Sequence, residues 1–209
     1  MTLDLDHLIV CVEDLDDAAA VFETRHGLRA VEGGRHPGHG TANRIIPLGR
    51  SYVELLAVID RDEAQRSSLG AWALAQAEVA DGGGVCLRTD DLDAVCQRLG
   101  LESVAMSRLT PEGVALTWRV AGIEEALIAS RPFFIQWDIP DELHPGRVSS
   151  EHPAGQVRLT GVALAGDREY VAGLEEWAPQ PGGLTYEVDE LDRPRLSYRF
   201  ASSPEGGND

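Results

Sequence analysis

The sequence predicts an α+β protein built from two consecutive βαβββ units and a third, truncated βαββ unit. The main observation is that one series of features occurs twice: an apolar strand, an Asp-Leu-Asp helix start and a Gly-Leu helix end. The copies comprise Val10-Cys11-Val12, Asp14-Leu15-Asp16 and Gly27-Leu28, then Val85-Cys86-Leu87, Asp91-Leu92-Asp93 and Gly100-Leu101. Repetition of a supersecondary unit at a fixed spacing indicates a duplicated architecture.

The first unit is predicted to span residues 1–60. It begins with a strand over 3–12, after which Asp14 is suited to cap a helix, because its carboxylate accepts hydrogen bonds from free backbone amides. The helix has apolar residues at one-face spacing and ends at Gly27. A short strand over 28–32, a glycine-rich loop over 33–40 and a hairpin of strands 41–48 and 51–58 complete the unit.

The second unit, with a crossover helix over 61–80, is predicted to end at residue 138. Its helix presents the apolar face Leu92, Val95, Cys96 and Leu99, and strands are expected near 103–106, 114–121 and 132–138. The proline-bearing stretch 139–156 is predicted to be a linker. Residues 157–201 are predicted to form the truncated module, with one helix and strands at 157–164, 184–188 and 195–201. Residues 202–209 are predicted to be a disordered tail.

The bulk properties exclude several classes of function. The chain has 209 residues and a formal net charge of -17, which argues against nucleic acid and anionic membranes as partners. This charge is compatible with a cationic ligand, or serves solubility alone. The three widely spaced cysteines are expected to be free thiols of a reducing compartment. With no signal peptide or transmembrane run in view, the sequence predicts a cytoplasmic protein with a small-molecule ligand.

Two polar side chains fall within predicted apolar strand faces. Because side chains alternate along a strand, Glu54 shares a face with Tyr52, Leu56 and Val58, and His7 shares one with Leu5, Ile9 and Cys11. A carboxylate among apolar neighbours is costly unless a cation, a donor or a proton compensates for it. We therefore expect His7 and Glu54 to form two walls of one pocket.

The segment before this hairpin holds further candidates. His39 is suited to act as a general acid or base, or is a solvated loop histidine, whereas His36 is expected to be structural. Thr41 and Asn43 share a strand face, from which Asn43 is suited to bind a carbonyl or carboxylate. Arg44 is on the other face and is expected to pair with an acidic surface residue.

Aromatic residues and linker histidines are less specific signals. Trp118 and Trp137 are expected to be core aromatics, or to stack on a ligand. His144 and His152 each precede a proline in the predicted linker and are expected to flank the mouth of the pocket.

Four motifs carry a family resemblance. They are Leu5-Asp6-His7-Leu8, His39-Gly40-Thr41-Ala42-Asn43-Arg44, Tyr52-Val53-Glu54-Leu55-Leu56 and Pro132-Phe133-Phe134-Ile135-Gln136-Trp137. Together with the two βαβββ units, they resemble the glyoxalase-like branch of the vicinal oxygen chelate superfamily, which includes glyoxalase I, extradiol dioxygenases and bleomycin-resistance proteins. The resemblance implies paired modules that curl into a half-barrel around a divalent metal, with ligands from the first and fourth strands of each module.

Transferred to this chain, the resemblance implies His7, Glu54 and Gln136 as metal ligands. The fourth position corresponds to Gly82, which offers no ligand, so one divalent metal (Zn, Ni, Mn or Fe) would be weakly held. Water or His39 would fill the open position. The alternative is a metal-free, hydrogen-bonded pair of His7 and Glu54.

Two functions remain open from the sequence. In the first, a lyase or isomerase acts on a carbonyl-containing metabolite: Glu54 or His7 moves a proton, with His39 as a further catalytic residue. The substrate would contact Thr41, Asn43, Gln136 and Trp137. In the second, a non-catalytic binding protein of the bleomycin-resistance type sequesters a cationic small molecule. Open sheet edges make a homodimer a further expectation.

Overall fold

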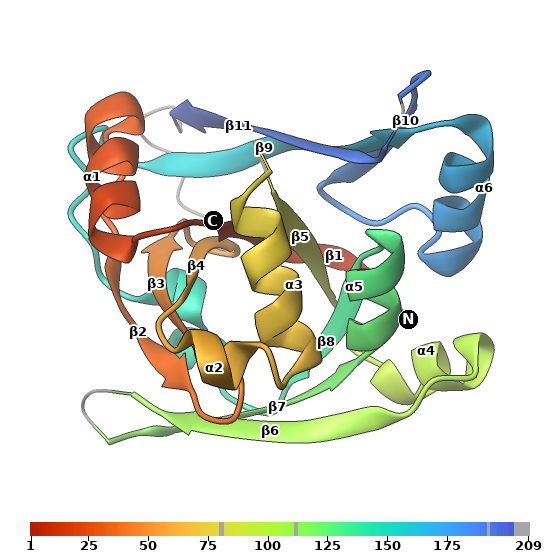
Figure 1. The fold of residues 1–209 in the computed structure, drawn as a ribbon, viewed down its shortest axis with the longest axis horizontal. Helices are drawn as coiled ribbons and strands as arrows, with labels where there is room; N and C mark the ends of the chain where they lie inside the picture. The colour runs from red at the N-terminus through yellow and green to blue at the C-terminus, as the bar shows by residue number, and fades with distance from the viewer. Residues whose placement is uncertain (80–81, 111–112, 192, 203–209) are drawn as a thin grey trace.

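The computed structural model describes residues 1–79, 82–110, 113–191 and 193–202. Eight strands form one sheet in the order β2-β3-β4-β1-β5-β8-β7-β6. Their bounds are β1 Asp4–Cys11, β2 Val31–His36, β3 Thr41–Pro47, β4 Tyr52–Val58, β5 Gly83–Arg88, β6 Ser103–Leu109, β7 Ala115–Ala121 and β8 Phe133–Trp137. The sheet curls into a half-barrel (Figure 1), so the predicted fold class is confirmed.

The two halves of the sheet are built alike. β1 pairs in parallel with β4, and β5 pairs in parallel with β8. The two central strands, β1 and β5, pair antiparallel, with His7 directly opposite Cys86. The strand order is therefore symmetric about the β1–β5 pair, as for two halves related by an approximate two-fold axis.

The helices of the two repeats begin and end as the sequence predicts. The carboxylates of Asp14 and Asp91 accept hydrogen bonds from the first-turn amides of α1 (Leu15–His26) and α4 (Leu92–Leu99). Gly27 and Gly100 end these helices with φ angles of 64° and 69°, in the left-handed region that glycine adopts without steric cost.

Two helical predictions differ from the structure. The crossover expected as one helix over 61–80 is two helices, α2 (Arg61–Ala64) and α3 (Ser68–Ala77), because the Ser67 hydroxyl accepts from the Gly70 amide and starts a new helix. Residue 80 lies outside the described residues. A further helix, α5 (Ile123–Ala129), precedes β8 and was not predicted. Its seven residues are too few to show a clear helical period.

The third unit forms a separate sheet. Strands β9 (Val157–Gly166), β10 (Leu184–Val188) and β11 (Arg195–Ser202) lie in the order β10-β9-β11, and α6 (Arg168–Trp177) connects the first two. The preceding segment contains two short 3-10 helices, η1 (Asp141–Leu143) and η2 (Pro145–Arg147). Of the predicted disordered tail, Ser202 belongs to β11, and 203–209 lie outside the described residues. Within the described residues, no helix combines the length and apolar character needed to cross a membrane.

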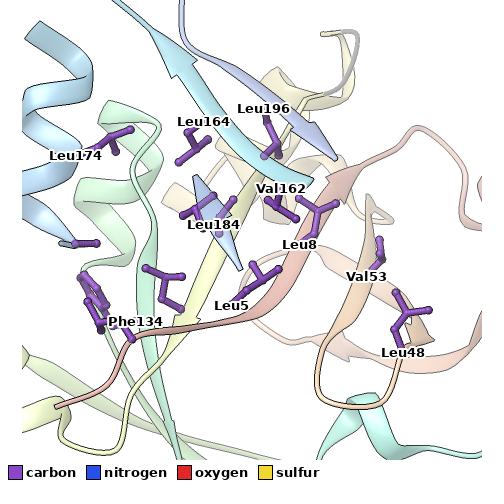
Figure 2. Packing of buried hydrophobic residues seen from close by; sticks show 14 of the residues in the cluster. Leu5, Leu8, Leu48, Val53, Phe134, Val162, Leu164, Leu174, Leu184 and Leu196 are labelled. Carbon is purple, nitrogen blue, oxygen red and sulfur yellow. The ribbon is translucent and has the colours of Figure 1, made fainter. Parts of the chain in front are cut away.

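The main core fills the space between the two sheets. Leu5 and Leu8 of β1 point toward β9 and β10, where Val162 and Leu184 lie (Figure 2). The small sheet thus covers the convex side of β1, while α3 and α5 pack on the concave side (Figure 1). A cavity therefore lies between the concave face of the half-barrel and these two helices.

A β-bulge in β1 changes which side chains face that cavity. The register with β5 shifts between Leu5 and His7, so Asp6 is an extra residue in the strand. Leu5 and Leu8 consequently share the core face although they are three apart, and Leu5 is not on the face of His7 as predicted. The bulge turns both Asp6 and His7 away from the core.

Candidate functional site

A cavity of about 310 Å³ opens on the concave face of the sheet. Its walls are mainly apolar and aromatic, and its polar groups come chiefly from the first half of the chain. Strands β1, β3, β4 and β8 supply His7, Ile9, Asn43, Ile45, Tyr52, Glu54, Leu56, Phe133, Ile135 and Trp137. This composition, an apolar enclosure with a few convergent polar groups, is typical of small-molecule sites.

His7 and Glu54 both line this cavity. Nε2 of His7 lies 3.6 Å from Oε2 of Glu54. The imidazole is stacked on the Tyr52 ring with centroids 4.5 Å apart, which fixes its plane. His7 is 4% exposed, so the pair lies at the base of the cavity.

Asp6 is hydrogen-bonded to the ring nitrogen of His7 that does not face Glu54. One carboxylate oxygen accepts from Nδ1 of His7 at 2.7 Å, and the other accepts from the Trp137 indole at 3.0 Å and from His144 Nε2 at 3.1 Å. Burial acts to raise the pKa of Asp6, but the hydrogen bonds from His144 and His7 outweigh it and hold that pKa below its usual range. Since the ionised carboxylate only accepts, Nδ1 of His7 carries the hydrogen and Nε2 faces Glu54.

Asp6 was not among the predicted site residues, and His144 was expected at the pocket mouth. In a regular strand Asp6 would face away from His7, and only the bulge brings both to one side. His144 is instead buried against Asp6, with its Nδ1 accepting from the Gly146 amide at 3.1 Å. The adjacent Asp-His pair was the available signal. His152 is elsewhere, bonded to the Pro47 carbonyl at 2.7 Å.

Asn43 holds Glu54. Its Nδ2 donates to Oε1 of Glu54 at 2.7 Å, while its Oδ1 accepts from the Gly34 amide at 2.7 Å. A Cβ at Gly33 would lie 2.0 Å from Asn43 Oδ1, so a glycine is required beside this contact. The amide of Asn43 is therefore directed at Glu54, which fixes one carboxylate oxygen and leaves the other facing His7.

The histidines of the predicted glycine-rich loop lie differently from expectation. His36 is the last residue of β2, since the strand extends into that segment. Nε2 of His36 is 4.0 Å from Oε1 of Glu54, and Nδ1 of His36 is 3.0 Å from the Thr41 hydroxyl. Thr41 is buried and is not among the residues that line the cavity, where it was expected to contact the substrate. Burial lowers the pKa of His36, against the opposing charge of Glu54. His39 lines the cavity, with Nδ1 3.1 Å from the Ser67 hydroxyl.

The prediction that Gln136 faces the cavity is wrong. Its side chain lies on the opposite face of β8, where its oxygen accepts from the Leu92 amide at 2.9 Å and from Arg119 at 3.2 Å. Gln136 thus stabilises the start of α4, and neither binds a ligand in the cavity nor offers a metal ligand there. Its neighbour Trp137 does line the cavity, packed against Trp118 at 5.3 Å.

Correct strand pairing also changes the positions that the resemblance assigns to metal ligands. The residue opposite His7 in the antiparallel β1–β5 pair is Cys86, and not Gly82. On β8, Phe133 pairs with Cys86 as Tyr52 of β4 pairs with His7, and Ile135 follows Phe133 on the cavity face as Glu54 follows Tyr52. The second half therefore offers a thiol and an alkyl side chain at the two positions.

These residues do not suit tight metal binding. Ligand atoms of Asp6, His7 and Cys86 lie within 4.8 Å of one another, so the group has the spacing to hold an ion. However, both oxygens of Asp6 are already hydrogen-bonded, and burial raises the pKa of the Cys86 thiol well above its usual value. Since a metal binds thiolate and not thiol, this group lacks a free strong ligand besides His7.

Other pairings agree with the sequence. Arg44 forms an ion pair with Asp16 on the surface, as predicted. The three cysteines are free, with Cys11 and Cys86 buried. None of these contacts belongs to the cavity.

Comparison with known proteins identifies the type of domain. A family model described as "Glyoxalase-like domain" matches residues 5–179. A hypothetical protein from Staphylococcus aureus has a TM-score of 0.70 at 20% identity, over 92% of this chain and 88% of that one. Methylmalonyl-CoA epimerases from Streptomyces coelicolor and Mycobacterium tuberculosis have TM-scores of 0.49 and 0.43, at 14% and 19% identity. They cover 66% and 64% of this chain, and 100% and 86% of their own. The comparison with curated proteins returns no match.

Proposed function

The chain belongs to the glyoxalase-like domain family, in the vicinal oxygen chelate superfamily, and from this premise we propose that it moves a proton next to the carbonyl group of a small molecule. The reaction would be that of an isomerase or lyase. The observation that carries the proposal is the 3.6 Å approach of His7 Nε2 to Glu54 Oε2 inside a mainly apolar cavity.

The two side chains suit complementary roles. Oε2 of Glu54 is the base that takes a proton from the carbon beside the carbonyl, because Asn43 occupies only Oε1. His7, as the imidazolium with hydrogens on both ring nitrogens, donates from Nε2 to the oxygen on which negative charge develops, and the buried Asp6 carboxylate at Nδ1 stabilises that imidazolium. His39 is a second proton carrier at the loop side of the cavity, and Trp137 an aromatic wall for the substrate.

This mechanism uses only the side chains of the chain itself. A divalent ion at His7 and Glu54 would have two strong ligands, which is fewer than the three protein ligands usual in catalytic zinc sites. Any Zn, Ni, Mn or Fe would be weakly held, and no step of the mechanism requires it. A cytoplasmic location and a homodimer remain predictions.

Proton exchange tests the proposal directly. The protein is incubated in D₂O with a panel of 2-oxo acids, aldehydes and thioesters, and loss of the α-proton signal is followed by NMR. We expect catalysed exchange with at least one class, and a fall of about 100-fold in Glu54→Gln, since positioned acid-base groups contribute about 10²–10⁴-fold. The control Glu169→Gln changes an exposed carboxylate of α6 and should exchange at the wild-type rate. Equal exchange by folded Glu54→Gln and wild type would refute the assignment.

Sequestration of a cationic small molecule is the second candidate. The observation in its favour is a carboxylate, Glu54, among the aromatic walls of the cavity, an arrangement that attracts organic cations. Tight binding of a cationic aromatic ligand without exchange on any substrate would support it over catalysis.

A further inference from the structure

The two edge strands of the large sheet approach each other at the cavity. β2 and β6 are at opposite ends of the strand order, yet a Cβ added to Gly34 of β2 would lie 4.0 Å from Cδ of Arg108 on β6. Arg35 of β2 and Arg108 of β6 both line the cavity. The curl of the half-barrel therefore brings two guanidinium-bearing side chains from distant sheet edges to one opening.

Arg35 and Arg108 lack the carboxylate partners that several other arginines have. Among the described residues, six arginines lie within ion-pair distance of carboxylates: Arg29, Arg44, Arg88, Arg119, Arg147 and Arg195. No such contact is found in the described part of the chain for Arg35 or Arg108, although the chain carries 35 acidic residues against 18 basic ones. Two cations without carboxylate partners at a cavity of such an acidic protein are suited to an anion from outside.

The positive charge of Arg108 acts on the pKa values of two groups that line the cavity, His36 and Tyr52. Burial lowers the pKa of His36, and the positive charge of Arg108 lowers it further. Burial raises the pKa of the Tyr52 phenol, and the same charge opposes that rise. Arg131 also lines the cavity, but its guanidinium lies over the Trp177 ring, 5.2 Å from the centroid, and is already engaged.

We propose that Arg35 and Arg108 form an anion clamp at the cavity, and that the ligand is a carbonyl compound whose apolar body ends in a carboxylate or a phosphate. The carbonyl part of this assignment rests on the proposed function. Guanidinium groups bind both anions through paired N–H donors. The anion would lie between the edge strands, the apolar body against the aromatic walls, and the carbonyl beside His7 and Glu54. The positive mouth also disfavours the cationic ligand of the alternative function.

Matched probes test the clamp by binding alone. Phenylpyruvate, its ethyl ester and 2-oxo-3-phenylpropyl phosphate share a benzyl body and an adjacent ketone, and differ in the terminal group. Isothermal titration calorimetry should show at least one of the two anions binding about tenfold more tightly than the ester, and the tighter one identifies the anion. Arg108→Gln should reduce anion affinity about tenfold and leave ester affinity unchanged. Arg158→Gln, which removes an exposed arginine of β9, is the control and should match wild type.

The outcomes separate this inference from the proposed function. Equal affinity for anions and ester, no anion binding at millimolar concentration, or equal loss of all probes in folded Arg108→Gln would each overturn the clamp. Because no turnover is measured, charge discrimination that persists in Glu54→Gln supports the clamp even if exchange is never observed. Catalysed proton exchange, together with equal affinity for the anionic probes and the ester, would refute the clamp and leave the proposed function intact.

Discussion

The carboxylate of Asp6 accepts a hydrogen bond from Nε2 of His144, which lies 3.1 Å away and 138 positions later in the chain. The same oxygen accepts from the Trp137 indole, so one buried group joins β1, β8 and the segment that follows β8. Asp6 therefore stabilises the fold and orients His7 at the same time, and these two effects are separable by experiment.

Replacing Asp6 by asparagine should destabilise the protein. An amide cannot accept from His7, His144 and Trp137 together without turning its own donors toward one of them, and an unsatisfied buried polar group costs about 1–3 kcal/mol. We expect Asp6→Asn to lower the free energy of unfolding by about 3 kcal/mol, measured by urea denaturation at pH 7. Wild-type stability in this variant would show that the three donors find other partners.

The difference in unfolding free energy between wild type and Asp6→Asn should depend on pH. The pKa of Asp6 in the folded state lies below its ordinary value of 3.8, so its contribution is complete above that value. That contribution is lost as the pH falls below 3.8 toward the folded-state pKa. The difference in unfolding free energy between wild type and Asp6→Asn should be constant from about pH 6 to pH 5 and should shrink below about pH 4. A difference that grows on acidification would contradict this sign.

Coupling between Asp6 and His144 can be measured in a double-mutant cycle. Because the two side chains share one buried hydrogen bond, the effects of Asp6→Asn and His144→Leu on unfolding free energy should be non-additive by about 1–3 kcal/mol. His152→Leu alters the other histidine of this segment, which contacts Pro47 and not Asp6. Its effect should add to that of Asp6→Asn within about 0.5 kcal/mol.

Gln136 should affect stability but not binding. Gln136→Ala removes the acceptor of the Leu92 amide at the start of α4, at a cost of about 1 kcal/mol. Because the side chain lies outside the cavity, affinity for a cavity ligand such as phenylpyruvate should not change in calorimetry. Ile135→Ala is the matched neighbour on the cavity face and should change that affinity. A selective loss of binding in Gln136→Ala would restore Gln136 as a site residue.

Metal content should be low and removable. With Ile135 and a protonated Cys86 at the second-half positions, purified protein dialysed against EDTA should lose any bound metal without a change in melting temperature. Elemental analysis before and after dialysis, with melting curves of both samples, measures this. One equivalent of metal per chain that survives EDTA would mean that a strong ligand has been missed.

Sequence reasoning worked where local chemistry decides the structure. Asp14, Asp91, Gly27 and Gly100 are cap residues whose roles follow from a side-chain oxygen or the lack of a Cβ, and all four act as predicted. The repeat of these caps was enough to give the fold class. His7 and Glu54 were placed on one cavity because their strands keep regular alternation after the bulge.

Errors arose where one residue of register decides the result. The prediction matched Gln136, and not Ile135, to Glu54. Because a shift by one residue exchanges the two faces of a strand, this placed the wrong side chains of β8 in the cavity. The bulge at Asp6 has the same effect, and nothing in the local sequence marks it. The roles of His144, Arg35 and Arg108 depend on contacts between distant segments, which periodicity does not encode.

The presence of both halves in one polypeptide has a consequence for how the two sides of the site can differ. If two identical single-unit chains associated along the strand that contains His7, every substitution would appear twice, and both sides of the cavity would carry the same chemistry. Joined in one chain, the halves vary independently. Here His7 of β1 lies opposite Cys86 of β5, and the cavity face carries Glu54 on β4 but Ile135 on β8, so the two halves present different chemistry.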